Sequence, residues 1–127
     1  MSKDLGNYDA QAEVFQALRN DEELSNLAVG GFHNKVASQD AAFPRVVYTE
    51  MNNAPSGYAD GKEVKATVNY QISIFTDAST VMHETSMIKA VDRIMKSLEY
   101  GKYDADSLYE EDTKLHHKLG LYTKNFY

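Results

Sequence analysis

Val64-Lys-Ala-Thr-Val-Asn-Tyr-Gln-Ile-Ser-Ile-Phe75 is the stretch that decides the fold of this chain. Apolar side chains occupy the even positions from Val64 to Ile74, and polar side chains occupy the odd positions up to Ser73. Successive side chains of a strand point to opposite faces, so this period of two predicts a strand with one face on a core. The other face is left for water or for a polar neighbour.

A long helix is expected almost directly after this strand. After Asp77 the apolar residues recur at the spacing of one helical face, at Val81, Met87, Ile88, Val91, Ile94, Met95 and Leu98. A strand and a helix in succession can each bury one apolar face against the other. We therefore expect the range 61–98 to supply most of the core. Asp77 or Ser79 would cap this helix, which would end near Tyr100 with Gly101 as its stop.

Length and composition limit the class of protein. The chain has 127 residues, a single-domain length that can bury roughly two-thirds of the surface of the unfolded chain. The sequence contains no cysteine, which excludes disulfides, thiolate zinc sites and cysteine nucleophiles. No apolar signal region is found at the N-terminus, and no run reaches the roughly 18 apolar residues of a membrane span. We therefore expect a soluble, unexported protein without a membrane partner.

Charge is distributed unevenly along the chain. Nineteen acidic and 13 basic residues give a net charge of −6, a field that repels polyanions and argues against tight binding of duplex DNA. Six acids and one lysine lie between Glu99 and Asp112, whereas three lysines and no acid lie between Thr113 and Tyr127. These opposite charges either meet as paired strands or lie on different faces and meet another copy of the chain.

The remaining segments predict shorter helices and further strands. Asn7 or Asp9 can cap a first helix, and Asn20 and Asp21 break that helix and can cap a second one over residues 22–27. Further strands are expected over the ranges 32–36, 45–49, 106–110 and 115–126. The prediction is a single α+β domain over residues 1–127. Its mostly antiparallel or mixed sheet packs against one long and one or two shorter helices.

Two kinds of segment are candidates for contact with other proteins. The range 52–62 is rich in Asn, Pro and Gly, which predicts a long loop that projects from the sheet, either functional or simply flexible. Several of the nine tyrosines fall on this loop or near the C-terminus. There they either form contact surfaces or pack half-buried over sheet edges. The candidate interface residues are Asn53, Tyr58, Asp60, Glu110, Glu111, Lys118, Tyr122 and Phe126.

The sequence predicts no catalytic residue, no metal site and no cofactor. His83-Glu84 begins like a zinc-protease motif, but Met87 stands where the second histidine is needed. His116 and His117 are adjacent in a predicted strand, so their side chains point to opposite faces and cannot chelate one ion there. The acids from Glu110 to Asp112 are more simply an exposed turn than a catalytic pair.

The order of these patterns resembles a known family. A helix with Val14-Phe-Gln-Ala-Leu-Arg19 precedes a glycine break and the strand Phe43-Pro-Arg-Val-Val-Tyr48. The strand Val68-Asn-Tyr-Gln-Ile-Ser-Ile-Phe75, the long helix, and the ending Leu108-Tyr-Glu-Glu-Asp-Thr113 to Leu115-His-His-Lys118 complete the pattern. In this order the chain resembles the tail completion, or tail-to-head joining, proteins of long-tailed bacteriophages and prophages, which are similar to tail terminators.

The resemblance implies a structural virion protein assembled in the cytoplasm of a bacterial host, with no enzymatic activity. Such a protein caps the head-proximal end of the tail tube, as a hexameric ring that can be monomeric in isolation. Its partners would be the tail tube protein and the head connector or stopper, with DNA passing through the lumen without sequence-specific binding. A head-closure or tail-tube component is the alternative, and a small hydrolase or ligand-binding enzyme a third hypothesis.

Overall fold

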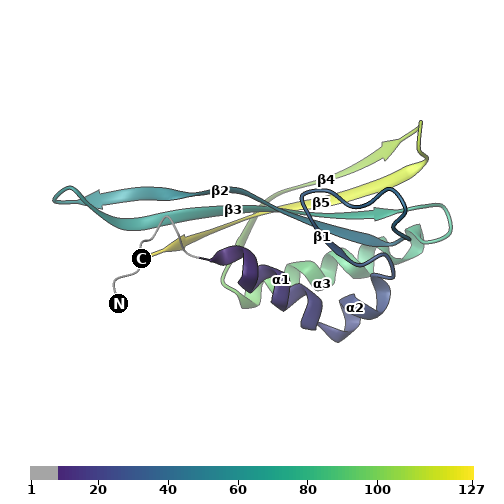
Figure 1. The fold of residues 1–127 in the computed structure, drawn as a ribbon, viewed down its shortest axis with the longest axis horizontal. Helices are drawn as coiled ribbons and strands as arrows, with labels where there is room; N and C mark the ends of the chain where they lie inside the picture. The colour runs from purple at the N-terminus through teal and green to yellow at the C-terminus, as the bar shows by residue number, and fades with distance from the viewer. Residues whose placement is uncertain (1–8) are drawn as a thin grey trace.

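One five-stranded sheet carries three α-helices on a single face in the computed structural model of this protein (Figure 1), which describes residues 9–127. The elements in chain order are α1 (Ala10–Asn20), α2 (Glu22–Leu27), β1 (Phe32–Asn34), β2 (Arg45–Ala59), β3 (Lys62–Thr76), the short 3-10 helix η2 (Val81–His83), α3 (Glu84–Ser97), β4 (Gly101–Glu110) and β5 (Leu115–Phe126). The strand order is β1-β2-β3-β5-β4. Among the described strands, only the β1–β2 pair is parallel, so the predicted α+β class with a mixed sheet is confirmed.

The strand predicted from the alternation is β3, which lies in the middle of the sheet between β2 and β5. Its even-numbered residues from Ala66 to Ile74 are fully buried, as the alternation predicts. The apolar stripe of α3 packs in the same cluster and includes Met87, Ala90, Val91, Ile94 and Met95. The strand and the helix that follows it therefore form the centre of the core, and the prediction from their two periods is confirmed.

Short side chains fix the starts of the first two helices. Asp9 accepts a hydrogen bond from the Ala12 N–H (3.2 Å) at the start of α1, whereas Asn7, the other predicted cap, lies outside the described residues. Asp21 accepts from the Leu24 N–H (3.0 Å) and caps α2. These bonds satisfy backbone donors that the first turn of a helix cannot satisfy itself.

The predicted end of the long helix is wrong by several residues. Helix α3 ends at Ser97, and the chain reverses at Glu99, whose φ of 71° lies in the left-handed region. Gly101 is not the stop residue but the first residue of β4. The backbone after the helix is held by bonds from the Glu99 N–H to the Lys96 carbonyl (2.9 Å) and from the Tyr100 N–H to the Met95 carbonyl (2.9 Å). These bonds close the helix end without a glycine.

The predicted long loop over residues 52–62 is a β-hairpin. Strand β2 continues to Ala59 and pairs antiparallel with β3, with register shifts that include one between Glu50 and Asn52. The reversal takes only Asp60 and Gly61, whose φ values of 51° and 76° suit a two-residue hairpin turn. The expected projection is observed, because the end of this hairpin extends well beyond the helices (Figure 1).

Other strand limits also differ from the prediction. Strand β4 begins at Gly101, not at Asp106, and β1 stops at Asn34, not at Val36. All ten residues of β4 are exposed, so this edge strand carries no burial pattern that would reveal it in the sequence. The turn of acids at Glu111-Asp112 does separate β4 from β5, as predicted.

Candidate functional site

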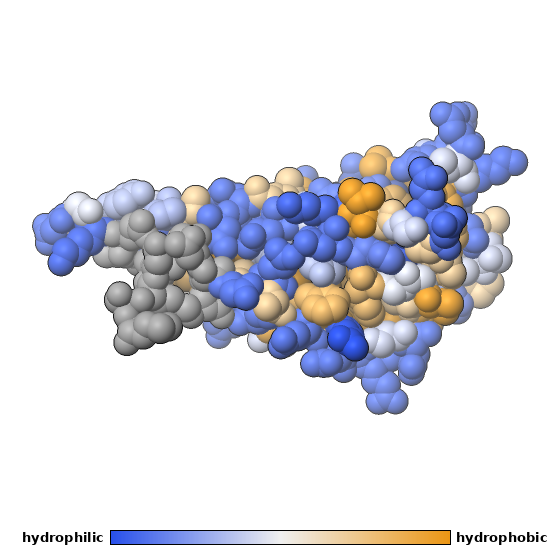
Figure 2. All heavy atoms as spheres, viewed as in Figure 1, coloured by the Kyte–Doolittle hydropathy of each residue, from blue (hydrophilic) through white to orange (hydrophobic). Residues whose placement is uncertain are grey.

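The β2–β3 hairpin forms an arm at one end of the sheet. Strand β5 pairs with β3 from Ala66 to Thr76. The arm is the remaining part of the hairpin, residues 56–65, and it consists of two strands only. Tyr58, near its end, is 64% exposed. Figure 2 shows mostly hydrophilic and intermediate residues over the arm, whereas the strongest apolar colour lies over the other half of the molecule. A two-stranded ribbon is marginally stable alone in water, and contact with a partner would stabilise it.

The β4–β5 hairpin projects at the opposite end of the sheet (Figure 1). Strand register places Asp104, Asp106 and Glu110 on the helix-free face, opposite the leucines of β5. Lys118 and Lys124 belong to the helix side, where Lys124 lies 3.9 Å from Glu13 of α1. The charges that the sequence places side by side therefore lie on paired strands but on different faces.

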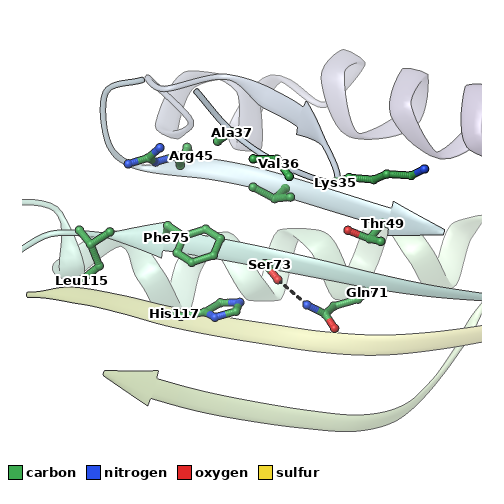
Figure 3. A pocket seen from close by; sticks show the side chains of 11 residues that line it. Lys35, Val36, Ala37, Arg45, Thr49, Gln71, Ser73, Phe75, Leu115 and His117 are labelled. Carbon is green, nitrogen blue, oxygen red and sulfur yellow. Dashed lines mark hydrogen bonds between the residues drawn. The ribbon is translucent and has the colours of Figure 1, made fainter. Parts of the chain in front are cut away.

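A shallow cavity of about 280 Å³ lies on the helix-free face of the sheet. Figure 3 shows its position between the segment after β1 and the strands β2, β3 and β5. The lining residues are Lys35, Val36, Ala37, Arg45, Val47, Thr49, Gln71, Ser73, Phe75, Leu115 and His117. Its walls combine apolar side chains with two cations, which suits a protein surface better than a polar small molecule.

His117 is the titratable imidazole of this cavity. Its ring stacks on Phe75 with the ring centroids 4.2 Å apart, and its Nε2 atom is buried without a hydrogen-bond partner. Burial lowers the pKa of His117, because it disfavours the charged imidazolium, while the carboxylates of Glu110 and Asp106 act in the opposite direction. The cations Lys35 and Arg45 line the same cavity. The neutral imidazole is therefore the form that this packing favours.

We expect acid to weaken the fold through His117. A lowered pKa in the folded chain means that the unfolded chain binds more protons below about pH 6.5, so stability falls as the pH decreases from there. Solvent screening at this half-buried site keeps the contribution below about 1 kcal/mol. Urea unfolding at pH 7.5 and 5.5 should show a smaller loss of stability for His117→Gln than for the wild type. His83→Gln, outside the cavity, is the control, and an equal loss in all three proteins would contradict the assignment.

Tyr122 ties the sheet to the helix layer. Its hydroxyl donates to Asp92 Oδ1 of α3 (2.5 Å), and Lys102 Nζ lies 3.1 Å from the same oxygen. The ring crosses Gly120, where an added Cβ would lie 2.5 Å from the Tyr122 oxygen. Burial and the Asp92 hydrogen bond raise the pKa of Tyr122. The glycine leaves the space that the tyrosine ring fills, as aromatic rings do over glycines of sheets.

The structure distributes the predicted interface residues over three places. Tyr58 and Asp60 lie on the arm, whereas Asn53 lies on β2 just before it, opposite Val68, and donates to Glu50 Oε1 (3.0 Å). Glu110 and Glu111 lie at the tip of the β4–β5 hairpin, far from the arm. The third group belongs to β5, with Lys118 and Phe126 partly buried and Tyr122 only 1% exposed. Their roles in contacts with other proteins remain predictions.

Several surface residues carry no local signal in the sequence. The cavity residues come from four separate segments, so no local pattern could have brought them together. Exposed side chains on β4 and after β1 include Leu108 (46%), Tyr109 (52%) and Val36 (78%).

The histidines do not form a metal centre in the described part of the chain. His116 and His117 contact different rings, Tyr109 and Phe75, as expected for neighbouring residues of a strand. Among the side chains that the structure describes, no three from histidine, aspartate or glutamate gather closely enough to hold a metal ion. None of the described helices has the length and apolar character required to cross a bilayer.

The mixed sheet with helices on one face is the fold of a known virion subunit. The chain is similar to a chain of the structure titled "Virion of native gene transfer agent (GTA) particle", with a TM-score of 0.63 and 17% sequence identity. The match covers 89% of this chain and 90% of that chain. At this identity the similarity establishes the shared fold. Among curated proteins, none matches the chain significantly.

The family is established by the sequence itself. Residues 12–119 match the profile of the family described as tail completion protein gp17. Because this range covers most of the chain, the protein belongs to the tail completion family, and the resemblance described above is confirmed. It is a structural protein of a phage-type tail and a component of the virion.

Proposed function

We propose that this protein closes the head-proximal end of the tail tube as a hexameric ring and provides the surface to which the head connector docks. The observation that carries the proposal is the match of residues 12–119 to the tail completion family. A tube that grows by head-to-tail contacts stays open until a last ring presents one face to the tube and a different face to the next component. A tail completion protein has to supply both faces.

The shape of the subunit supports contact with two different partners. The arm and the β4–β5 hairpin project at opposite ends of one sheet (Figure 1). The arm carries the exposed Tyr58, whereas the other hairpin carries Glu110 and Glu111. Aromatic side chains favour buried protein contacts, and acidic side chains favour basic partners. We assign the arm and this hairpin to different contacts at the junction.

The acidic side chains on the helix-free face of the sheet also suit a channel through which DNA passes. Asp104, Asp106 and Glu110 lie on the helix-free face, and the whole chain has a net charge of −6. A lumen lined by carboxylates repels phosphates, so DNA can pass without adhering. We therefore assign the helix-free face to the lumen and expect no sequence-specific contact with DNA.

Deletion of the gene from a producing strain tests this function. We expect filled heads beside overlong or unjoined tails, because nothing would then stop the tube and connect it to the head. Electron microscopy of the lysate gives the result, and the wild-type gene on a plasmid should restore joined particles. Heads that lose their DNA would contradict tail completion and would place the protein in head closure. A lack of tubes would assign it to the tail tube.

A further inference from the structure

Both edges of the sheet are open in the described part of the chain. Strand β4 pairs only with β5, and its ten residues are all exposed. On the other side, the three residues of β1 pair with β2 only from Val46 to Tyr48. Strand β2 continues to Ala59, so no other described strand pairs with most of its outer edge. Open strand edges are templates for pairing with another chain, unless side chains block them.

The edge of β4 carries side chains that oppose its pairing with the β4 strand of a second copy. Asp104 Oδ1 accepts from the Ala105 N–H (2.9 Å), and Asp106 Oδ1 accepts from the Ser107 N–H (2.8 Å). Ala105 and Ser107 are alternate residues of β4, and alternate N–H groups of an edge strand point away from its single neighbour, so the two side-chain bonds fit donors on the open side. Two β4 strands related by a two-fold axis would bring these carboxylates together. Like charges across strands oppose that arrangement.

The opposite edge carries charges of the other sign on the same face. Lys35 follows β1 directly and is exposed, and Arg45 is the first residue of β2. Both line the cavity of the helix-free face, the face to which Asp104 and Asp106 belong. Arg45 is held by the Ser38 carbonyl (2.7 Å), so Lys35 is the better placed cation for a partner. Complementary edges favour contact between copies that have the same orientation.

Strand direction agrees with such a contact. Strand β4 runs antiparallel to β5, β5 antiparallel to β3, and β3 antiparallel to β2, while β1 is parallel to β2. When two copies stand side by side in the same orientation, β4 of one therefore lies antiparallel to β1 and β2 of the next. A head-to-tail contact of this kind closes into a ring if the rotation between copies allows it. A stagger between strands, as in barrels, would set the register.

We propose that β4 of each subunit pairs with the β1–β2 edge of a second copy, so that the sheets join into one closed sheet with the helices outside. The occupant of each open edge is thus another copy of this chain. On pairing, the Asp104 and Asp106 carboxylates release the Ala105 and Ser107 N–H groups, which then donate to the neighbouring strand. The two carboxylates turn toward Lys35 of that copy. This inference rests on the proposed ring and identifies its subunit contact.

Cross-linking tests the contact directly, because the chain contains no cysteine. Ser107→Cys on β4 and Asn34→Cys on β1 are combined in one chain and treated with a short bis-maleimide. The two sites are about 19 Å apart within one subunit, at roughly 4.8 Å per strand, so the short linker joins only different copies. We expect a ladder of covalent oligomers up to the hexamer, with single bands for each one-cysteine variant. Both concentrated purified protein and purified particles are treated.

Two outcomes would overturn the proposal. Dimers from Ser107→Cys alone would show two-fold pairing of β4, and the lack of a ladder in both preparations would show that these edges do not meet. A charge exchange is the matched control. The ladder should be abolished by Lys35→Asp alone, and also by the double variant Asp104→Lys with Asp106→Lys. The chain that carries all three changes should form the ladder again. A failed restoration would contradict the assigned ion pairs.

The failure of the ring contact can be separated from the failure of the proposed function. Labelled antibodies locate the protein on particles by electron microscopy and do not depend on the cross-link. A ladder in purified protein with no label at the tail end would support the edge contact and contradict the assigned position at the tail end. Label at the tail end without a ladder would support the position at the tail end and contradict the contact between β4 and the β1–β2 edge.

Discussion

Val91→Asp is expected to leave the chain unfolded at 25 °C. Val91 is fully buried in α3, within the cluster that joins this helix to β3. A carboxylate without a partner at this depth costs several kcal/mol, and a domain of this size has a total stability of only about 5–15 kcal/mol. Circular dichroism and urea unfolding would show the loss of cooperative structure.

Two further variants identify the cause of that loss. Val91→Ala removes apolar volume without adding charge, so it should cost about 2 kcal/mol and leave a cooperative transition. Lys89→Asp places the same carboxylate on the exposed side of α3 and should change stability by about 0.5 kcal/mol or less. An unpaired buried charge costs about 3–5 kcal/mol. If the Val91→Asp protein unfolded cooperatively, with a free energy of unfolding within about 1 kcal/mol of that of the Val91→Ala protein, the assignment of Val91 to the core would be wrong.

The core could be predicted because its two main elements carry local periods. Every described even position of β3 from Ala66 to Ile74 is buried, and the stripe of α3 recurs at helical spacing. One-sided burial imposes such periods on any sequence that folds in this way. Caps such as Asp21 were found for the same reason, since their chemistry acts within one helical turn.

The arm could not be predicted in this way because pairing across the sheet determines it. Residues 52–59 contain Asn, Pro and Gly, which disfavour strands, yet β2 continues through them against β3 with several register shifts. Only Asp60 and Gly61 use their turn chemistry. The partner strand therefore overrides the local preference, and the loop prediction is correct only at Asp60 and Gly61.

The placement of Tyr122 depends on a residue two positions earlier in the strand. A tyrosine near the C-terminus suggested an exposed contact, but Gly120 on the same face leaves room for its ring, and Asp92 of α3 accepts its hydroxyl. The spacing Gly-x-Tyr in a strand was the available indication of this packing. The cavity beside Phe75 had no such indication, since its lining residues are far apart in the sequence.

Tyr58→Ala is expected to leave a folded subunit that joins tails to heads poorly. The side chain is 64% exposed, so its removal should change the free energy of unfolding by about 0.5 kcal/mol or less. Aromatic side chains central to an interface contribute about 2 kcal/mol or more, and a ring repeats that loss in every subunit. The fraction of joined particles, counted by electron microscopy after complementation of the deletion, should fall about tenfold or more.

A variant with a shortened arm gives the stronger form of this test. Replacement of residues 56–65 by Asn-Gly keeps the pairing of Pro55 with Ala66 and supplies a favourable two-residue turn. This variant should fold and should leave heads and tails separate, because the arm ends before Tyr58. Met82→Ala is the matched control, since that apolar side chain is 73% exposed and lies on η2, away from the arm. If the shortened arm gave normal numbers of joined particles, the arm would have no role at the junction.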